Sequence, residues 1–174
     1  TDVDHRKKLM KSIERVFDNG TFIMGSEVEN FEKKFAQMIG VPHAVGLSSG
    51  TNALFLALKA LDIGPGHEVI TTPMSWVATL NAIHLTGATP VFVDIGDDLN
   101  IDPDKIKMAI TKNTKAILPV HYNGLLCDMI QIMSIAEEHD LLVVEDAAQA
   151  VGAEIPEGKA GSFGHASAYS FNPM

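Results

Sequence analysis

Short apolar segments alternate with amphipathic segments along most of the chain. The apolar runs predict strands, and the helical spacing between them predicts helices. The predicted strands cover residues 44–48, 68–72, 90–94, 116–120, 141–145 and 166–171. The predicted helices cover residues 51–61, 75–86 and 128–139, with a short helix that begins at Asp102-Pro103. This alternation predicts a three-layer α/β/α fold with a mostly parallel sheet.

Two further helices are predicted before the first strand. Leu9, Ile13 and Phe17 share one face of a helix over residues 3–18. A second helix is expected over residues 26–39, because Ser26-Glu27-Val28-Glu29 has the pattern of a capping box with Ser26 at the N-cap.

Composition and charge narrow the functional class. Hydrophobic residues make up 46% of the 174 residues and charged residues 20%, as in a globular domain. The net charge of −9 and the lack of a basic run argue against nucleic-acid binding. Long uncharged stretches are broken by Gly and Pro, which favours buried strand–helix passages over membrane spans. The single cysteine, Cys127, excludes an internal disulfide. A cytoplasmic location is therefore expected, with a bacterial periplasm as the alternative.

Ligands of open α/β sheets bind at the carboxyl ends of the strands, so the residues there are candidates for a site. Ser48-Ser49-Gly50-Thr51 precedes a helix, where free amides bind anions, although the same residues suit a simple N-cap turn. Trp76, the only tryptophan, follows the next strand. Its ring fits either stacking on a heteroaromatic cofactor or packing in the core.

Two more strand ends carry polar residues. Glu145-Asp146 follows a wholly apolar strand, where a carboxylate is costly unless it has a cationic partner or several donors. A carboxylate of this segment serves either as the counter-ion of a cationic ring nitrogen or as the cap of the following turn. His121-Tyr122-Asn123-Gly124 either binds substrate or turns the chain.

Motifs of other enzyme classes are absent from the sequence. There is no G-x-G-x-x-G fingerprint and no G-x-S-x-G elbow. The segment from Gly152 to Ala160 departs from a phosphate-binding loop in spacing and in its last residue. The histidines and the cysteine show no metal-ligand spacing, so no metal is expected.

The order of these segments resembles the DegT/StrS family of pyridoxal-phosphate (PLP) sugar aminotransferases, which have the aspartate-aminotransferase fold. The resemblance runs from the helix at Phe31-Glu32 to Ser170-Phe171. Its most specific part is Glu145-Asp146-Ala147-Ala148-Gln149-Ala150, followed by Gly161-Ser162-Phe163-Gly164. The other matching segments are residues 45–51, 64–70, 75–79, 87–94, 100–103 and 119–122.

The resemblance implies a role for each candidate residue. Asp146 would pair with the pyridinium nitrogen of PLP, Gln149 would bond the ring's 3-oxygen, and Trp76 would stack on the ring. The phosphate would be held by Gly50, Thr51 and Ser170. Gly25 and His121 would face the substrate. The family also implies a homodimer with its site at the subunit interface.

One residue of the family pattern is missing. The family's Schiff-base lysine would be the residue immediately after Met174, where the sequence stops. Lys159 is a poor substitute, because its glycine-rich surroundings predict an exposed hairpin. We therefore expect residues 1–40 to be an N-terminal helical segment. Residues 41–174 would be the first part of the PLP-binding large domain, with the remainder and a small C-terminal domain outside this sequence.

The resemblance thus implies an aminotransferase that converts a nucleotide-linked keto-sugar to an amino sugar. Glutamate would be the amino donor, and the product would serve polysaccharide or antibiotic biosynthesis. Two alternatives stay open. A PLP-dependent sugar dehydratase of the same fold has His in place of the lysine. A regulatory module would bind a nucleotide sugar without catalysis.

Overall fold

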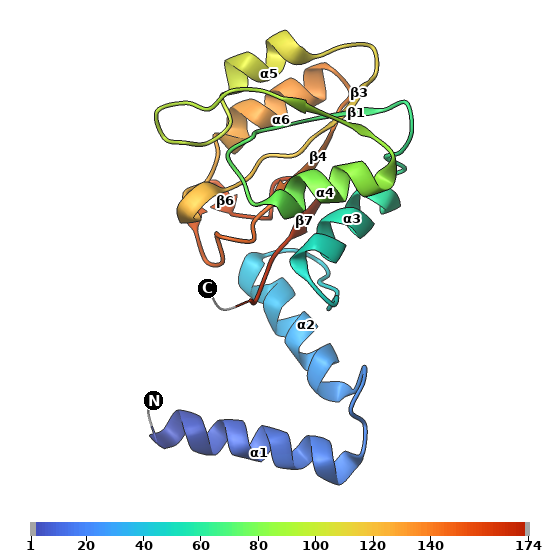
Figure 1. The fold of residues 1–174 in the computed structure, drawn as a ribbon. Coiled ribbons are helices and arrows are strands. Elements are labelled where there is room, and N and C mark those ends of the chain that lie inside the picture. The colour runs from blue at the N-terminus through green and yellow to red at the C-terminus, as the bar shows by residue number, and fades with distance from the viewer. Residues whose placement is uncertain (1–2, 173–174) are drawn as a thin grey trace. The chain divides into compact units, whose positions relative to one another are not determined.

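A computed structural model describes residues 3–172, which form two compact units with their boundary between Gly46 and Leu47 (Figure 1). The first unit contains two helices, α1 (Val3–Asn19) and α2 (Ser26–Ile39), so both predicted N-terminal helices are confirmed. Gly40 ends α2 in the left-handed conformation, with φ 90°, which a glycine adopts without strain.

The predicted capping box at the start of α2 is wrong. Gly25 is the N-cap residue, with φ −86° and ψ −178°, and Ser26 is already the first helical residue. No side chain caps this end of the helix. The hydroxyl of Ser26 therefore lies one position too late to accept a hydrogen bond from the third helical amide.

The strand predicted over residues 44–48 is also wrong. A strand requires a neighbour with which to exchange backbone hydrogen bonds, and no strand of the described residues pairs with this segment. Val45 is 74% exposed, and the amide of Gly46 donates to Oε1 of Glu32 at 2.6 Å. Residues 44–48 therefore form an extended segment that is hydrogen-bonded to the side chain of Glu32 and not to another strand.

The second unit is built on a parallel sheet. Its strands are β1 (Glu68–Thr71), β2 (Thr89–Phe92), β3 (Thr114–Ile117), β4 (Leu142–Asp146) and β7 (Ala166–Ala168). They lie in the order β2-β1-β3-β4-β7, and every neighbouring pair is parallel. The predicted parallel sheet is confirmed, and its carboxyl ends all face one edge.

Helices cover both faces of this sheet, as the three-layer prediction requires (Figure 1). Helices α3 (Gly50–Ala60) and α4 (Val77–Thr86) lie on one face, where Leu54, Leu58 and Ile83 belong to the first core cluster. Helices α5 (Pro103–Ala109) and α6 (Met129–Glu138) lie on the other, and Ile106 and Ile132 belong to the second.

Asp102 caps α5 as predicted, since its side chain accepts a hydrogen bond from the amide of Asp104. A single short turn, η1 (Tyr122–Gly124), follows β3. The hairpin predicted around Lys159 is present as β5 (Glu154–Ile155) and β6 (Gly158–Lys159), but Lys159 is half-buried rather than exposed.

Most other predicted elements differ from the structure only at their ends. Helix α4 begins at Val77 rather than at residue 75, because Trp76 adopts the extended conformation of an N-cap. Strand β7 stops at Ala168, three residues before the predicted end. Its last partner is Asp146, where β4 itself ends, so no neighbour remains for a longer strand.

Gly164 tests how tightly the loop before β7 packs on the sheet. A methyl group there would lie 2.8 Å from the carbonyl oxygen of Val143 and 3.3 Å from Oε1 of Glu145. Since both atoms belong to a central strand and cannot easily move, we expect Gly164→Ala to lower the free energy of unfolding by about 1–3 kcal/mol.

The matched control is Gly64→Ala. Its methyl group would meet only the carbonyl oxygen of Thr86, at an ordinary 3.6 Å. Urea unfolding of both variants measures the difference, and a loss of equal size in the two would contradict the packing described here.

Candidate functional site

The carboxyl edge of the sheet brings together residues that are far apart in the sequence. Asp146 ends β4 and pairs with Ala168 of β7, so Ser170 lies just beyond the same edge. Strand β1 ends at Thr71, and the chain passes from there to Trp76 at the start of α4. Asp146, Trp76 and Ser170 therefore all follow strand ends at one edge, as the sequence predicted.

Asp146 is a buried carboxylate with few partners. Its relative exposure is 5%. Thr79 of α4 donates its hydroxyl to Oδ2 at 2.7 Å, and the amide of Ala148 donates to Oδ1 at 3.2 Å. Burial raises the pKa of Asp146, and these two hydrogen bonds oppose that effect.

No Lys or Arg among residues 3–172 lies within ion-pair distance of Asp146. A carboxylate that is buried without a cation is costly. Asp146 is therefore suited to accept a cationic ligand, and the turn-cap alternative explains only its bond to Ala148.

Trp76 lies on the surface, so the core-packing alternative for this residue is wrong. It is the N-cap of α4 and is 75% exposed. Its carbonyl oxygen accepts the amide of Thr79 at 3.1 Å, which fixes the indole-bearing residue one helical turn from the hydroxyl that contacts Asp146. An exposed aromatic ring at this position is available for a ligand.

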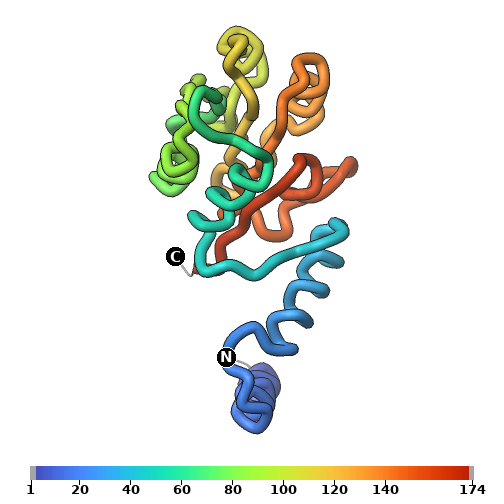
Figure 2. The backbone as a smooth tube through the Cα atoms, turned by 90° about the vertical axis from the view of Figure 1, so that its right-hand side faces the viewer, coloured from blue at the N-terminus to red at the C-terminus, as the bar shows by residue number. Residues whose placement is uncertain are grey.

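The start of helix α3 lies beside the chain that follows β7, and we call this pair of segments the cradle (Figure 2). Ser49 caps the helix by accepting the amide of Asn52 at 3.2 Å, so the predicted N-cap turn is confirmed. A methyl group on Gly50 would lie 3.2 Å from Cβ of Ser170 and 3.3 Å from the carbonyl oxygen of Tyr169. Thr51 follows in the first helical turn. The cradle thus combines helix-start amides with a hydroxyl, which is the chemistry of an anion site.

Gln149 lies in the turn after β4 and is half-buried. Its Oε1 accepts the amide of Asn123 at 3.0 Å. The structure gives its NH2 group no hydrogen-bond partner within residues 3–172. The NH2 group of Gln149, three positions after Asp146, is therefore available as a donor. This agrees with the hydrogen bond to the ring's 3-oxygen that the resemblance implies.

His121 is fully buried, and the substrate contact that the resemblance implies for it stays a prediction. The ring is 0% exposed, and both of its nitrogens are engaged within the protein. Nδ1 accepts the amide of Cys127 at 3.2 Å, and Nε2 donates to Oε2 of Glu145 at 2.9 Å. Burial raises the pKa of the Cys127 thiol to about 12, so this cysteine is not a nucleophile. Within residues 3–172, the ring of His121 thus anchors the turn that follows β3.

Glu145 is the anchor of this region, a role that sequence reasoning missed. Besides His121, it accepts the amides of Gly161, Phe163 and Gly164 at 2.6–2.8 Å. Neighbouring residues of a strand point to opposite faces, so Glu145 and Asp146 are directed apart. The sequence signal was present in the apolar strand that ends in two carboxylates, but only one of them was given a function.

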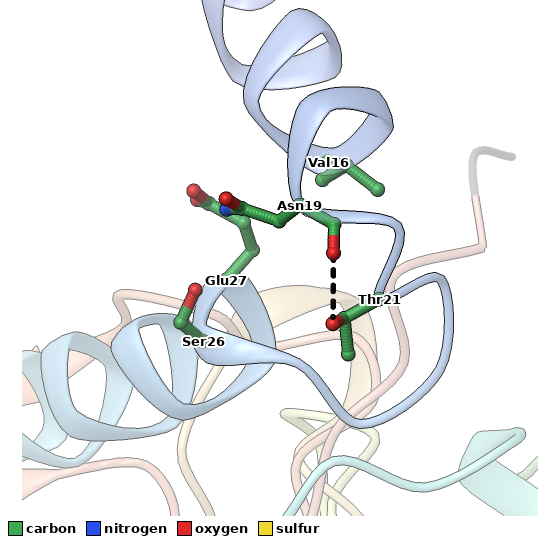
Figure 3. A pocket seen from close by; sticks show the side chains of 5 residues that line it. All are labelled: Val16, Asn19, Thr21, Ser26 and Glu27. Carbon is green, nitrogen blue, oxygen red and sulfur yellow. Dashed lines mark hydrogen bonds between the residues drawn. The ribbon is translucent and has the colours of Figure 1, made fainter.

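Gly25, the second predicted substrate residue, belongs to the first unit. It precedes Ser26 and Glu27, which line a pocket of about 210 Å³ with Val16, Asn19 and Thr21 (Figure 3). The Thr21 hydroxyl donates a hydrogen bond to the carbonyl oxygen of Asn19 at 3.4 Å (Figure 3). None of the predicted cofactor residues lines this pocket, and the role of Gly25 stays a prediction.

The predicted lysine after Met174 lies outside the described residues. Among those residues, no group of three His, Cys, Asp or Glu side chains is arranged to bind a metal. Within the same part of the chain, no helix has the length and apolar character needed to cross a membrane.

Comparison with known proteins identifies the fold. The profile of the DegT/DnrJ/EryC1/StrS aminotransferase family matches residues 3–174. The chain belongs to this family. Members similar to it include a UDP-N-acetyl-3-dehydro-alpha-D-glucosamine 3-aminotransferase of Acidithiobacillus ferrooxidans, which is 46% identical over 169 residues, or 97% of this chain and 46% of the relative.

Solved structures of the family have the same fold. DesV of Streptomyces venezuelae, in complex with a ketimine intermediate, superposes with a TM-score of 0.90 at 42% identity, over 95% of this chain and 44% of that one. Spr1654 of Streptococcus pneumoniae in its PLP form superposes with a TM-score of 0.84 at 31% identity, over 92% and 46%. This chain spans less than half the length of each of these relatives.

The burial of Asp146 predicts a pH-dependent penalty on stability in the absence of ligand. The raised pKa means that the unfolded chain loses this proton at a lower pH than the folded protein. The wild type therefore loses stability as the pH rises from the ordinary aspartate pKa, about 3.9, to the raised value. Asp146→Asn removes this loss. Its Oδ1 still accepts from Ala148, and its NH2 group donates to Thr79 if that hydroxyl rotates.

We expect the free energy of unfolding of Asp146→Asn, relative to wild type, to increase with pH over that window and then level off. Urea unfolding between pH 4 and pH 8 measures it. Asp97→Asn is the control, because Asp97 is exposed and should show no such trend. A difference that falls as the pH rises would contradict the assignment of an uncompensated carboxylate.

Proposed function

We propose that this chain is the first part of a PLP-dependent aminotransferase that converts a nucleotide-linked keto-sugar to an amino sugar, with an amino acid, glutamate, as donor. The observation that carries the proposal is Asp146, a carboxylate that is buried with no cation beside it among residues 3–172, at the sheet edge that Trp76 and Ser170 follow. Family membership and the names of the relatives support it.

The residues present fit PLP, which has a ring nitrogen at one end and a phosphate at the other. Asp146 would hold the nitrogen, and Trp76 would cover one face of the ring. Gln149 would donate its NH2 group to the 3-oxygen, since its carbonyl is already bonded to Asn123. Gly50, Thr51 and Ser170 would hold the phosphate, because amides at the start of α3 and a hydroxyl bind anions there. The lack of a Cβ on Gly50 allows its close approach to Ser170.

When bound, PLP supplies a conjugated ring that accepts electrons from the substrate carbon during amino transfer. The residues of this chain control that property. An ionised Asp146 holds a proton on the ring nitrogen, because removing the proton would leave the carboxylate buried without a cation. The anion cradle and Trp76 fix the orientation of the ring, and the edge of the sheet supplies a rigid base for both.

Three further parts of the proposal concern the whole protein. A lysine after Met174 would provide the catalytic amine. A second subunit would complete the site in a homodimer, as the family resemblance implies. A cytoplasmic location agrees with a buried, unpaired Cys127.

The direct test is product formation by the full-length protein loaded with PLP. UDP-linked and dTDP-linked keto-sugars are incubated with glutamate, and mass spectrometry detects the amino sugar and 2-oxoglutarate. We expect both products from wild type and nearly none from Asp146→Asn. Loss of water without amino transfer would favour the dehydratase instead. Binding of the nucleotide sugar without any reaction would favour the regulatory module.

Trp76 provides an independent prediction. Because the indole is exposed, Trp76→Ala should change the free energy of unfolding of the ligand-free protein by less than about 0.5 kcal/mol. The affinity for PLP should fall by about 1 kcal/mol, which is roughly fivefold, through the lost stacking contact.

Titration of the full-length apo protein with PLP, followed by absorbance, measures that affinity. Val151→Ala serves as the control, since Val151 is an exposed apolar residue of another loop. Unchanged PLP affinity in Trp76→Ala would remove this residue from the site.

A further inference from the structure

The hydroxyl of Thr79 lies in the middle of a short hydrogen-bond chain. Its Oγ1 is 2.6 Å from Oγ of Ser75 and 2.7 Å from Oδ2 of Asp146. An ionised carboxylate only accepts, so Thr79 donates to Asp146. Its single proton is then used, and Thr79 accepts from Ser75. The chain therefore runs in one direction, from Ser75 through Thr79 to Asp146.

We propose that Thr79, oriented by Ser75, is a positioning residue that keeps Asp146 ionised and turned toward the ring nitrogen of the cofactor. This inference rests on the proposed function. Binding of the ring nitrogen would then depend on Asp146 and Thr79 together and not on Asp146 alone.

Among residues 3–172, Thr79 is the side chain that donates a hydrogen bond to Asp146. The remaining donor is the amide of Ala148, at the longer distance of 3.2 Å. Of the titratable groups nearby, His121 favours the ionised carboxylate, and it is bonded to Glu145. Glu145 points to the other face and is occupied by three backbone amides as well. The hydrogen bond from Thr79 is the largest effect that opposes burial.

Thr79 is well suited to fix an orientation. It is 2% exposed and lies in the first turn of α4, where its amide bonds the carbonyl oxygen of Trp76. A β-branched side chain inside a helix has few rotamers, so the hydroxyl has little freedom. The same helical turn thus carries the exposed indole and holds Oδ2 of Asp146. Oδ1, with its single longer bond, keeps capacity to accept from a ligand.

The test compares Thr79→Val, which has the same shape without the hydroxyl, with Thr79→Ser, which keeps it. The matched control is Thr71→Val. Thr71 is equally buried, but it donates to the carbonyl oxygen of Leu118 at 2.8 Å and not to a carboxylate. Ser75→Ala is the second variant, which removes the orienting donor and leaves Thr79 in place.

Three quantities are measured on the full-length protein, one by titration of the carboxyl and two by binding and kinetics. The first is the titration of the Asp146 carboxyl in the apo protein, by ¹³C NMR with Asp146→Asn for assignment. The second is the dissociation constant of PLP, and the third is the pH profile of kcat. We expect Thr79→Val to raise the pKa of Asp146, to move the acidic limb of kcat to higher pH and to weaken PLP binding about tenfold or more. Ser75→Ala should move each quantity in the same direction by less.

Thr79→Ser should restore all three quantities, and Thr71→Val should lower only the melting temperature. The inference is overturned if the wild type binds PLP while both Thr79→Val and Ser75→Ala leave the Asp146 titration unchanged. A wild-type protein that does not bind PLP would instead overturn the proposed function, and this inference with it.

Discussion

The structure is organised around a carboxylate that is buried with no cation beside it among residues 3–172. Asp146 has two hydrogen bonds, one from Thr79 and one from the backbone, and burial raises its pKa. A folded protein rarely retains such a group unless a ligand compensates for it. The sheet places the end of β4 at the edge where Trp76 and the cradle at Gly50 also lie. The position of this one charge therefore determines what the whole edge can bind.

The neighbouring residue, Glu145, is also a buried carboxylate, but the protein itself supplies its hydrogen-bond partners. Glu145 is fully buried but accepts four hydrogen bonds, from His121 and from three amides of the loop before β7. Because adjacent residues of a strand face opposite sides, one carboxylate ties the loop to the sheet while the other faces α4. Glu145 thereby fixes the path of the chain toward Ser170. The two carboxylates together set where the nitrogen end and the phosphate end of a cofactor would be held.

Much of this arrangement follows from the sequence. Short apolar runs between helical segments predict a parallel sheet, and the rule that ligands bind at the carboxyl ends of its strands then selects Asp146 and Trp76. Ser170 came only from the family resemblance. The sequence could not predict which segments pair as strands or which side chains bond one another. The apolar residues 44–48 form no strand because no strand of the described residues is beside them. The resemblance implies that His121 contacts the substrate, and the sequence could not predict that both ring nitrogens form hydrogen bonds with Glu145 and Cys127. Thr79 had no predicted role, since its contact joins residues 67 positions apart.

Asp146 is proposed to hold a proton on the ring nitrogen of PLP. The most direct measurement is the ¹⁵N chemical shift of ring-labelled PLP bound to the full-length protein, in wild type and in Asp146→Asn. The account predicts the shift of a protonated pyridinium in wild type and a move toward that of neutral pyridine in the variant. A neutral ring nitrogen in wild type, or the same shift in both proteins, would contradict it.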